Sequence, residues 1–331
     1  MLIGVDKQGR SVMLEVNNLK VEFLSNGKSI APVDGVSFTV GANETVGLLG
    51  ESGCGKSVTA LSILRLFPLA SKARLSGEVR YDGHDLLTLD DAGMRAVRGK
   101  QIAMIFQEPM TSLNPLHKIG AQLGEMLRMH TTLVRREIDY MVIAMLQRVG
   151  LSRAEQLVNE YPHSLSGGMR QRVMIAMALL CDPGVLICDE PTTALDVTIQ
   201  AQILDLMRQL KQEQGTSILM ITHDLGVVAE MCERVVVMYA GQVVEQSSVH
   251  ELFDAPAHPY TRALMRARPA LDAKPGQPLN AIPGSVPLPG TAGAGCRFAA
   301  RCTKADDLCR SKMPELAAVT PGHLVRCWHP N

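Results

Sequence analysis

A glycine-rich segment near the start of the chain has the composition of a phosphate-binding loop. Residues 50–57 read GESGCGKS and fit G-x4-G-K-[ST], between the apolar run TVGLL and the helical run SVTALSILRLF. In this context glycines let backbone N–H groups surround phosphates, while the lysine reaches the β- and γ-phosphates and the serine hydroxyl binds Mg²⁺. A simple glycine-rich turn is the alternative, which the flanking elements disfavour. We expect nucleotide contacts from Gly50, Ser52, Gly53, Cys54, Gly55, Lys56, Ser57 and Val58.

Two adjacent carboxylates follow a second apolar run. Residues 185–188 read VLIC and precede Asp189 and Glu190. Ligands of parallel α/β sheets bind at the carboxyl ends of the strands. We therefore expect Asp189 to hold Mg²⁺ through water and Glu190 to orient and polarise the attacking water. Such a pair can also be a solvated strand cap, but a phosphate motif in the same chain favours catalysis.

Residues 165–172, LSGGMRQR, place a second glycine-rich sequence at the start of a helical run, which is another potential anion site. This segment resembles the signature sequence of ABC ATPases. The resemblance implies a head-to-tail dimer in which Ser166, Gly167 and Gly168 contact the γ-phosphate bound to the other subunit. Ser166 is equally suited to be a helix N-cap, and the two roles are compatible.

Further positions match the ABC ATPases one by one. Gln107, after QIAMI and Phe106, resembles the loop glutamine that senses Mg²⁺ and water, and Ala194-Leu195-Asp196 resembles the loop that communicates across the dimer. His223, after SILMIT, resembles the switch histidine that contacts the γ-phosphate. Phe23 stands where the family places an aromatic ring on adenine, although phenylalanine equally fills a core. The resemblance implies catalytic roles for Glu190, His223 and Gln107, and Mg²⁺ ligation by Ser57, Gln107 and Asp189.

Within that family, residues 104–115 (MIFQEPMTSLNP), 190–202 and 258–260 (HPY) resemble the peptide and nickel importer branch. This implies an ATP-hydrolysing subunit at the cytoplasmic face of the inner membrane that drives peptide uptake. The implied partners are a second, paralogous ATPase, two transmembrane permeases and an external solute-binding protein, without nucleic acid. Nickel chelates and glutathione-like solutes are alternative cargoes. A nucleic-acid-handling ABC ATPase is disfavoured because the chain has one ATPase and no long heptad run, and a metal-sensing regulator is a further alternative.

Four cysteines crowd into the last 36 residues: Cys296, Cys302, Cys309 and Cys327, spaced C-x5-C-x6-C-x17-C. Four thiolates suit a [4Fe–4S] cluster or tetrahedral zinc, and unligated thiols are the third alternative. The absence of a closely spaced C-x2-4-C pair favours iron–sulfur over zinc. This tail also resembles the dipeptide and oligopeptide subunits of the importer branch. The other cysteines, Cys54, Cys181, Cys188 and Cys232, are expected to be isolated core or loop residues.

These residues need particular elements to position them. Short β-rich runs are expected at residues 14–23, 35–40, 44–49 and 78–81, the last entering a tight turn at Asp82-Gly83. Continuous apolar runs at 101–106, 185–188 and 217–221 indicate strands buried on both faces, and apolar spacing over 120–150 indicates helices. We therefore predict an α/β phosphate-loop NTPase core of ABC type over residues 13–265. It carries an inserted helical subdomain at about 108–165, an N-terminal extension at 1–12 and a small, Pro- and Gly-rich, irregular metal-binding extension at 266–331.

The composition is that of a globular protein with a well-filled core. Of 331 residues, 46% are hydrophobic and 20% charged, and 33 basic residues balance 33 acidic ones. The balance disfavours a global positive field that would recruit nucleic acid or anionic lipid. The longest apolar run, residues 173–181, is far shorter than the roughly 20 residues that cross a bilayer. We expect no signal peptide, and membrane association through partners.

Overall fold

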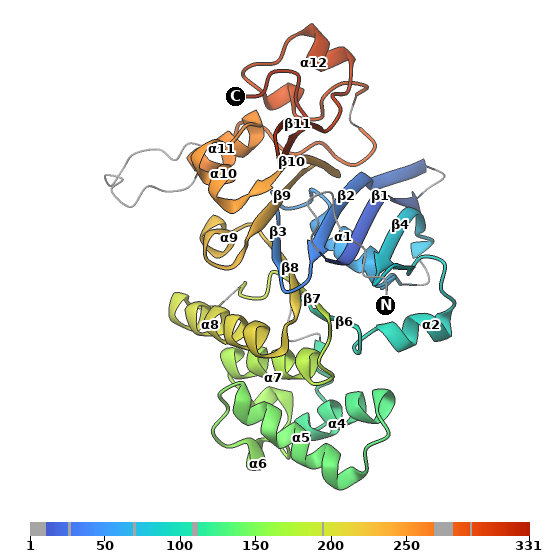
Figure 1. Ribbon diagram of the computed structural model, residues 1–331, viewed down its shortest axis with the longest axis vertical. Coiled ribbons are helices and arrows are strands. Elements are labelled where there is room, and N and C mark those ends of the chain that lie inside the picture. Colours follow the sequence, from blue (N-terminus) through green and yellow to red (C-terminus); the bar gives the residue numbers. More distant parts are fainter. Residues whose placement is uncertain are drawn as a thin grey trace. The chain divides into compact units, whose positions relative to one another are not determined.

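The computed structural model describes residues 11–25, 28–68, 71–107, 112–193, 195–267, 281–291 and 293–331. Most of the expected N-terminal extension, Ala194 and the proline-containing stretch 268–280 lie outside the described residues. The chain divides into two compact units. Unit 1 comprises residues 1–14, 40–45 and 81–221, and unit 2 comprises residues 15–39, 46–80 and 222–331. Each unit combines strands with helices (Figure 1).

Unit 1 contains a parallel three-stranded arrangement of buried strands. β7 (Val185–Asp189) pairs with β6 (Ile102–Ile105) on one side and with β8 (Ser217–Thr222) on the other. All residues of β7 and β8 are buried, as the apolar runs predicted. α8 (Val197–Gln214) connects β7 to β8; it begins at its cap Asp196 and ends at Gly215, whose φ of 68° suits glycine.

The helical part of unit 1 consists of α2 (Asp91–Val97), α4 (Ile119–His130), α5 (Arg135–Arg148), α6 (Ala154–Leu157), η2 (Pro162–Ser164) and α7 (Gly167–Leu179). α4 and α5 contact each other and both contact α7, and Figure 1 shows the group in green. The apolar spacing over residues 120–150 is confirmed, since Leu123 and Leu127 of α4 and Ile138 and Val142 of α5 are buried. The apolar run at 173–181 lies mostly in the buried face of α7.

Unit 2 contains a mixed sheet to which the C-terminal tail contributes. β9 (Arg234–Tyr239) pairs in parallel with β3 (Thr45–Leu49) and antiparallel with β10 (Gln242–Ser248). β10 then pairs with β12 (His323–Val325), and β12 with β11 (Ala317–Thr320). The tail is therefore less irregular than expected. Strands of three and four residues are too short for an alternating pattern to reveal them.

The helices of unit 2 are α1 (Lys56–Ile63), α9 (Leu225–Met231), α10 (Val249–Asp254), α11 (Pro259–Ala267), η3 (Ala299–Arg301) and α12 (Asp307–Ser311). Figure 1 shows α1 beside β1 and β2, and α10 and α11 close to each other. Across the described part of the chain, we find no helix with the length and apolarity that a membrane span needs.

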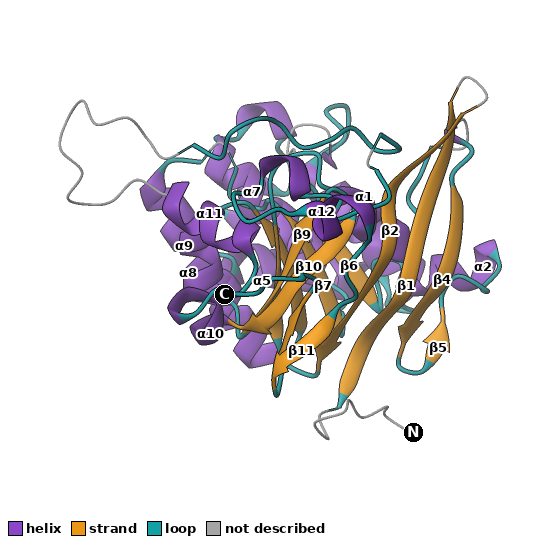
Figure 2. Ribbon diagram, turned by 90° about the horizontal axis from the view of Figure 1, so that it is seen from above, coloured by secondary structure: helices purple, strands orange, loops and turns teal. Residues whose placement is uncertain are grey.

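A second sheet is built from long strands. β1 (Val12–Ser25) lies between β2 (Lys28–Gly41) and β4 (Arg74–Tyr81), and the three run side by side in Figure 2. The expected turn after β4 is confirmed: Asp82 and Gly83 have φ values of 46° and 79°, which fit a type I′ turn leading into β5 (His84–Asp85).

Candidate active site

The phosphate loop joins β3 to α1, as expected, and close contacts require glycine at two of its positions, Gly50 and Gly55. A Cβ atom on Gly50 would lie 2.3 Å from the carbonyl oxygen of Met238 in β9. A Cβ on Gly55, whose φ is 105°, would lie 2.5 Å from the carbonyl oxygen of Pro32. Glycine alone leaves room for the neighbouring backbones, and so the loop can turn tightly before α1.

Lys56 is held inside this loop. Its side chain is buried, and Nζ donates hydrogen bonds to the carbonyl oxygens of Gly50, at 2.7 Å, and Glu51, at 3.1 Å. The charge is therefore centred on the loop, where a phosphate group would be cradled. Ser57 and Val58 follow in the first turn of α1 and are half-buried, whereas Ser52 and Gly53 are exposed. Burial raises the pKa of the Cys54 thiol, which stays neutral.

The loop and the predicted switch histidine border the same cavity. Gly50, Glu51 and Ser52 line it from one side, and His223 and Asp224 from another. His223 is exposed after β8, and Asp224 caps α9 by accepting a hydrogen bond from the N–H of Gly226 at 2.7 Å. Within unit 2, the structure thus brings His223 to the phosphate loop.

The predicted catalytic carboxylate in unit 1 is fixed by two donors. Glu190 Oε2 accepts hydrogen bonds from Gln107 Nε2 at 3.2 Å and from Thr193 Oγ1 at 2.9 Å. Asp189, the last residue of β7, is buried at 5% exposure. Gln107 and Glu190, 83 positions apart in the sequence, are therefore in direct contact. The role of Thr193 was not foreseen; its signal is a hydroxyl three residues after the carboxylate, in the turn of EPTTALD.

The signature residues form the beginning of α7, where Ser166 and Gly167 are exposed and Gly168 is half-buried. Ser166 caps the helix by accepting a hydrogen bond from the N–H of Met169 at 3.3 Å. A Cβ on Gly167 would meet no atom within 4 Å, so this backbone faces open space. The helix N-terminus therefore presents N–H groups to the surroundings, which suits an anion.

α7 is also linked to the segment that contains Glu190 through Gln171, a residue for which the sequence suggested no role. Gln171 is buried, and its Nε2 donates to the carbonyl oxygen of Pro191 at 2.5 Å. Pro191 directly follows Glu190, so this hydrogen bond links α7 to the segment that carries the predicted catalytic carboxylate. Asp196 caps α8 by accepting from the N–H of Ile199 at 2.9 Å.

Phe23 packs edge-to-face on Phe67, with ring centroids 5.5 Å apart and an interplanar angle of 83°. Its side chain is half-buried in β1. Such a T-shaped pair is a favourable aromatic contact. The structure accounts for Phe23 by this packing; its contact with adenine stays a prediction.

The four tail cysteines converge on one small cavity, although they span 32 positions of the sequence. Cys296, Cys302, Cys309 and Cys327 line it together with Phe298, Trp328 and His329. Backbone N–H groups of Lys304 and His329 donate to the sulfurs of Cys302 and Cys327, at 3.4 and 3.3 Å. Burial raises the pKa of Cys327 to about 11, with the neighbouring thiols adding to the effect, and also raises the pKa of Cys296.

Thiols, backbone N–H donors to sulfur and apolar side chains meet at this cavity. Among the described residues, the ligand atoms that lie within 4.8 Å of one another belong to Asp306, Cys309 and His329. The four thiols do not form such a group, whereas a single zinc ion bound at about 2.3 Å would need sulfurs about 4 Å apart. Asp306 was not foreseen as a candidate ligand; it accepts a hydrogen bond from His329 Nε2 at 2.8 Å.

Comparison with known proteins agrees with the motifs. The family model "ABC transporter" matches residues 33–193, and the model "Oligopeptide/dipeptide transporter, C-terminal region" matches residues 244–309. A probable peptide ABC transporter ATP-binding protein of Sinorhizobium fredii is 52% identical over 97% of this chain and 96% of its own length. The oligopeptide transport ATP-binding protein AppD of Bacillus subtilis is 52% identical over 96% of this chain and 97% of its own.

Solved structures show the same cassette. The ATP-binding cassette MJ0796, in a dimeric post-hydrolysis state bound to ADP and Pi, superposes with a TM-score of 0.64 at 28% identity. That match covers 72% of this chain and 99% of the cassette. The cbiO1 protein of Clostridium perfringens superposes with a TM-score of 0.62 at 27% identity, covering 73% of this chain and 90% of cbiO1. The chain therefore belongs to the ABC transporter ATPases, and its C-terminal region to the oligopeptide/dipeptide transporter type.

Proposed function

We propose that this chain binds and hydrolyses ATP as the cytoplasmic subunit of an importer for peptides. The observation that carries the peptide assignment is identity of about half the residues, over nearly the full length, to proteins named for peptide transport. Hydrolysis is supported by the geometry of Glu190, whose carboxylate is oriented by Gln107 and Thr193. A carboxylate fixed in this way is suited to polarise a water molecule.

The residues divide the work as the family resemblance implies. Residues 50–58 hold the phosphates, with Lys56 supplying positive charge, and His223 contacts the γ-phosphate. Ser57, Gln107 and Asp189 ligate Mg²⁺, and Phe23 stacks on adenine. Ser166, Gly167 and Gly168 bind the γ-phosphate of a neighbouring subunit, which agrees with the exposure of Ser166 and Gly167 at the start of α7. We assign residues 13–265 to the cassette and 266–331 to the C-terminal extension.

The proposed assembly contains a second, paralogous ATPase, two transmembrane permeases and an external solute-binding protein. A tagged chain, expressed from its own genome and purified in mild detergent, tests this composition. Uptake is then measured in vesicles with labelled dipeptides, longer peptides, a nickel chelate and glutathione. ATP-dependent accumulation of peptides supports the proposal. Accumulation of the nickel chelate or glutathione alone, without peptides, would contradict the cargo, and co-purification with nucleic acid would contradict the assembly.

We further propose that the four-cysteine cavity binds a [4Fe–4S] cluster, with zinc as the alternative. The group would cross-link a tail that has little apolar core of its own. Protein purified without oxygen should contain about four iron and four sulfide per chain. Cys302→Ser should lose both, whereas Cys181→Ser, a half-buried cysteine of unit 1, should keep both. One zinc per chain would favour the alternative, and metal-free protein would reject both.

A further inference from the structure

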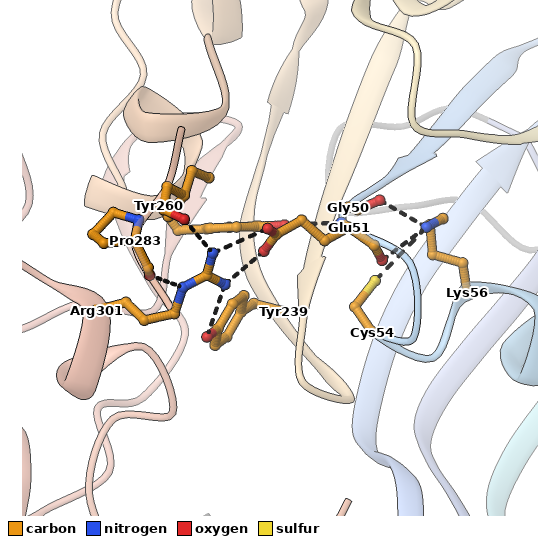
Figure 3. A network of polar contacts seen from close by, with 9 residues as sticks. Gly50, Glu51, Cys54, Lys56, Tyr239, Tyr260, Pro283 and Arg301 are labelled. Atoms are coloured by element: carbon orange, nitrogen blue, oxygen red, sulfur yellow. Dashed lines mark hydrogen bonds and ion pairs between the residues drawn. The ribbon is translucent and has the colours of Figure 1, made fainter. Parts of the chain in front are cut away.

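A buried arginine of the C-terminal extension is paired with the phosphate loop. Arg301 ends η3, directly before Cys302, and its side chain is only 5% exposed. Its guanidinium forms a two-pronged ion pair with Glu51, Nη1 to Oε2 at 2.8 Å and Nη2 to Oε1 at 3.1 Å (Figure 3). Such bidentate pairs are geometrically specific and stronger than neutral hydrogen bonds.

Each nitrogen of the Arg301 guanidinium also donates a hydrogen bond to a group other than Glu51. Its Nε donates to the carbonyl oxygen of Pro283 at 2.8 Å, Nη2 also to that of Ile282 at 3.3 Å, and Nη1 also to the hydroxyl of Tyr239 at 3.4 Å. The guanidinium group of arginine stays charged over the whole pH range in which proteins are folded. Because all three guanidinium nitrogens donate hydrogen bonds, the Arg301 side chain is held in one orientation, and the ion pair holds the Glu51 carboxylate with it.

Glu51 is held just as completely on the loop side. Its backbone N–H donates to the hydroxyl of the buried Tyr260 at 2.9 Å, and its carbonyl oxygen accepts from Lys56 Nζ at 3.1 Å. In Figure 3, Arg301 and Lys56 lie on opposite sides of Glu51. The tail arginine, the loop glutamate and the phosphate-binding lysine thus form one continuous row of contacts.

The ion pair between Arg301 and Glu51 should affect ATP binding, because Glu51 is negatively charged like the phosphates. A carboxylate within the loop that receives the polyphosphate repels it, because like charges a few ångströms apart interact strongly where water is partly excluded. The Glu51 side chain is 28% exposed, so solvent screens it only in part. Arg301 neutralises that carboxylate from the side of the tail, while Lys56 contacts the backbone carbonyl of Glu51.

We propose that Arg301 is a positioning residue of the nucleotide site, which makes the C-terminal extension part of the phosphate loop. It acts through Glu51, by neutralising the carboxylate and fixing the loop backbone. The inference rests on the ATP binding proposed above. It assigns a function in nucleotide binding to an arginine 250 positions away from the loop.

The test is equilibrium binding of Mg-ATP to the full-length chain by titration calorimetry. Arg301→Gln should weaken binding about tenfold or more, since it removes a charge-assisted pair and leaves Glu51 unneutralised. Arg301→Gln combined with Glu51→Gln should bind more tightly than Arg301→Gln alone, because the repelling carboxylate is gone. The single Glu51→Gln variant completes the double-mutant cycle. Arg310→Gln, which removes an exposed charge of the tail paired to Asp307 at 3.8 Å, should bind as the wild type does.

The outcomes separate the inference from the proposed function. Wild-type protein that binds no ATP would contradict the nucleotide site itself, and Lys56→Ala provides the binding-deficient reference. Unchanged affinity in Arg301→Gln would overturn the positioning role. So would a loss that Glu51→Gln does not relieve, because Arg301 would then support only the folding of the tail. If Arg301→Gln does not fold, Arg301→Lys is used instead, because it retains the charge without the two-pronged geometry. Arg301→Lys should bind ATP more weakly than wild type, and adding Glu51→Gln should restore the affinity. If the affinity is not restored, the positioning role is overturned.

Discussion

At the scale of single residues, Glu190 combines an unusual backbone conformation with hydrogen bonds that hold it. Its backbone has a φ of 48°, a left-handed conformation that costs a non-glycine residue about 1–3 kcal/mol. The N–H of Glu190 donates to the carbonyl oxygen of Ile221 at 2.9 Å, and Gln107 and Thr193 hold the carboxylate. These contacts offset the strain and hold both the backbone and the carboxylate of Glu190 in place.

Replacing Glu190 with Gln should therefore separate binding from hydrolysis. The amide oxygen still accepts from Thr193, but it cannot take a proton from water, so ATP hydrolysis should fall about 10²-fold or more. ATP binding should persist, and the closed dimer should accumulate. Phosphate release and equilibrium ATP binding are the two measurements. Glu213→Gln, which removes an exposed carboxylate paired with Arg148 in the same unit, is the control, and near-normal turnover in Glu190→Gln would refute the role.

Substitutions of Lys56 and Ser166 should affect different steps, ATP binding in the first case and closure on a partner subunit in the second. Lys56→Ala removes a charge-assisted contact worth about 1.5–3 kcal/mol, so ATP affinity of the isolated chain should fall about 10- to 100-fold. Ser166→Arg should leave that affinity intact but block closure on a partner, because Ser166 is exposed at the start of α7. Loss of the cap should also cost about 1 kcal/mol of stability. Calorimetry and analytical ultracentrifugation measure the two effects, and equal loss of ATP binding in both variants would contradict the division.

At the scale of elements, one buried carboxylate joins three of them. Glu245 of β10 has no exposed surface. Its Oε1 accepts from the N–H of Ala257 and from His323 Nε2 of β12, each at 2.7 Å, and its Oε2 accepts from the N–H of His258 at 2.9 Å. The chain entering α11 and the last strand of the tail are therefore fastened to β10 by the same side chain.

Glu245→Ala should loosen the tail selectively. It leaves two backbone N–H groups and an imidazole buried without an acceptor, at about 1–3 kcal/mol each. We expect the urea midpoint of unfolding to fall and proteolysis within residues 281–331 to accelerate. Asp254→Ala, an exposed carboxylate of α10, serves as the control. Equal protease resistance in Glu245→Ala and wild type would show that the tail is anchored elsewhere.

At the scale of the whole molecule, the stability should depend on pH through a buried histidine. His258 Nδ1 accepts from the N–H of Tyr260 at 3.0 Å, and burial lowers the pKa of His258 to about 4. The unfolded chain binds a proton near pH 6.5, whereas the folded chain resists it until about pH 4. Stability present above pH 6.5 is therefore lost as the pH falls toward 4, by about 2 kcal/mol at pH 5.

His258→Asn tests this contribution, because its amide oxygen can accept from the same N–H without titrating. The variant should be less stable at pH 7, owing to the smaller side chain, but should lose about 2 kcal/mol less than wild type between pH 7 and pH 5. Urea unfolding at the two pH values measures the difference. Identical pH dependence in the two proteins would show that His258 is not responsible.

Features encoded by neighbouring residues could be predicted from the sequence. The phosphate loop, the cap Ser166 and the turn at Asp82-Gly83 depend on backbone conformations that a few adjacent residues determine. The buried strands β7 and β8 were recognisable because strands covered on both faces are apolar throughout. Family motifs then named Gln107, Glu190 and His223 from their positions after such strands.

Only the tertiary structure decided what those residues contact. It placed Thr193 on Glu190, gathered four cysteines around one cavity, added β12 to β10 and joined Arg301 to Glu51. Arginine, threonine and glutamate occur at many positions of any chain, and their types alone do not indicate partners. Which of them meet across as many as 250 positions is settled by the packing of whole elements, since each contact forms only after both elements are in place.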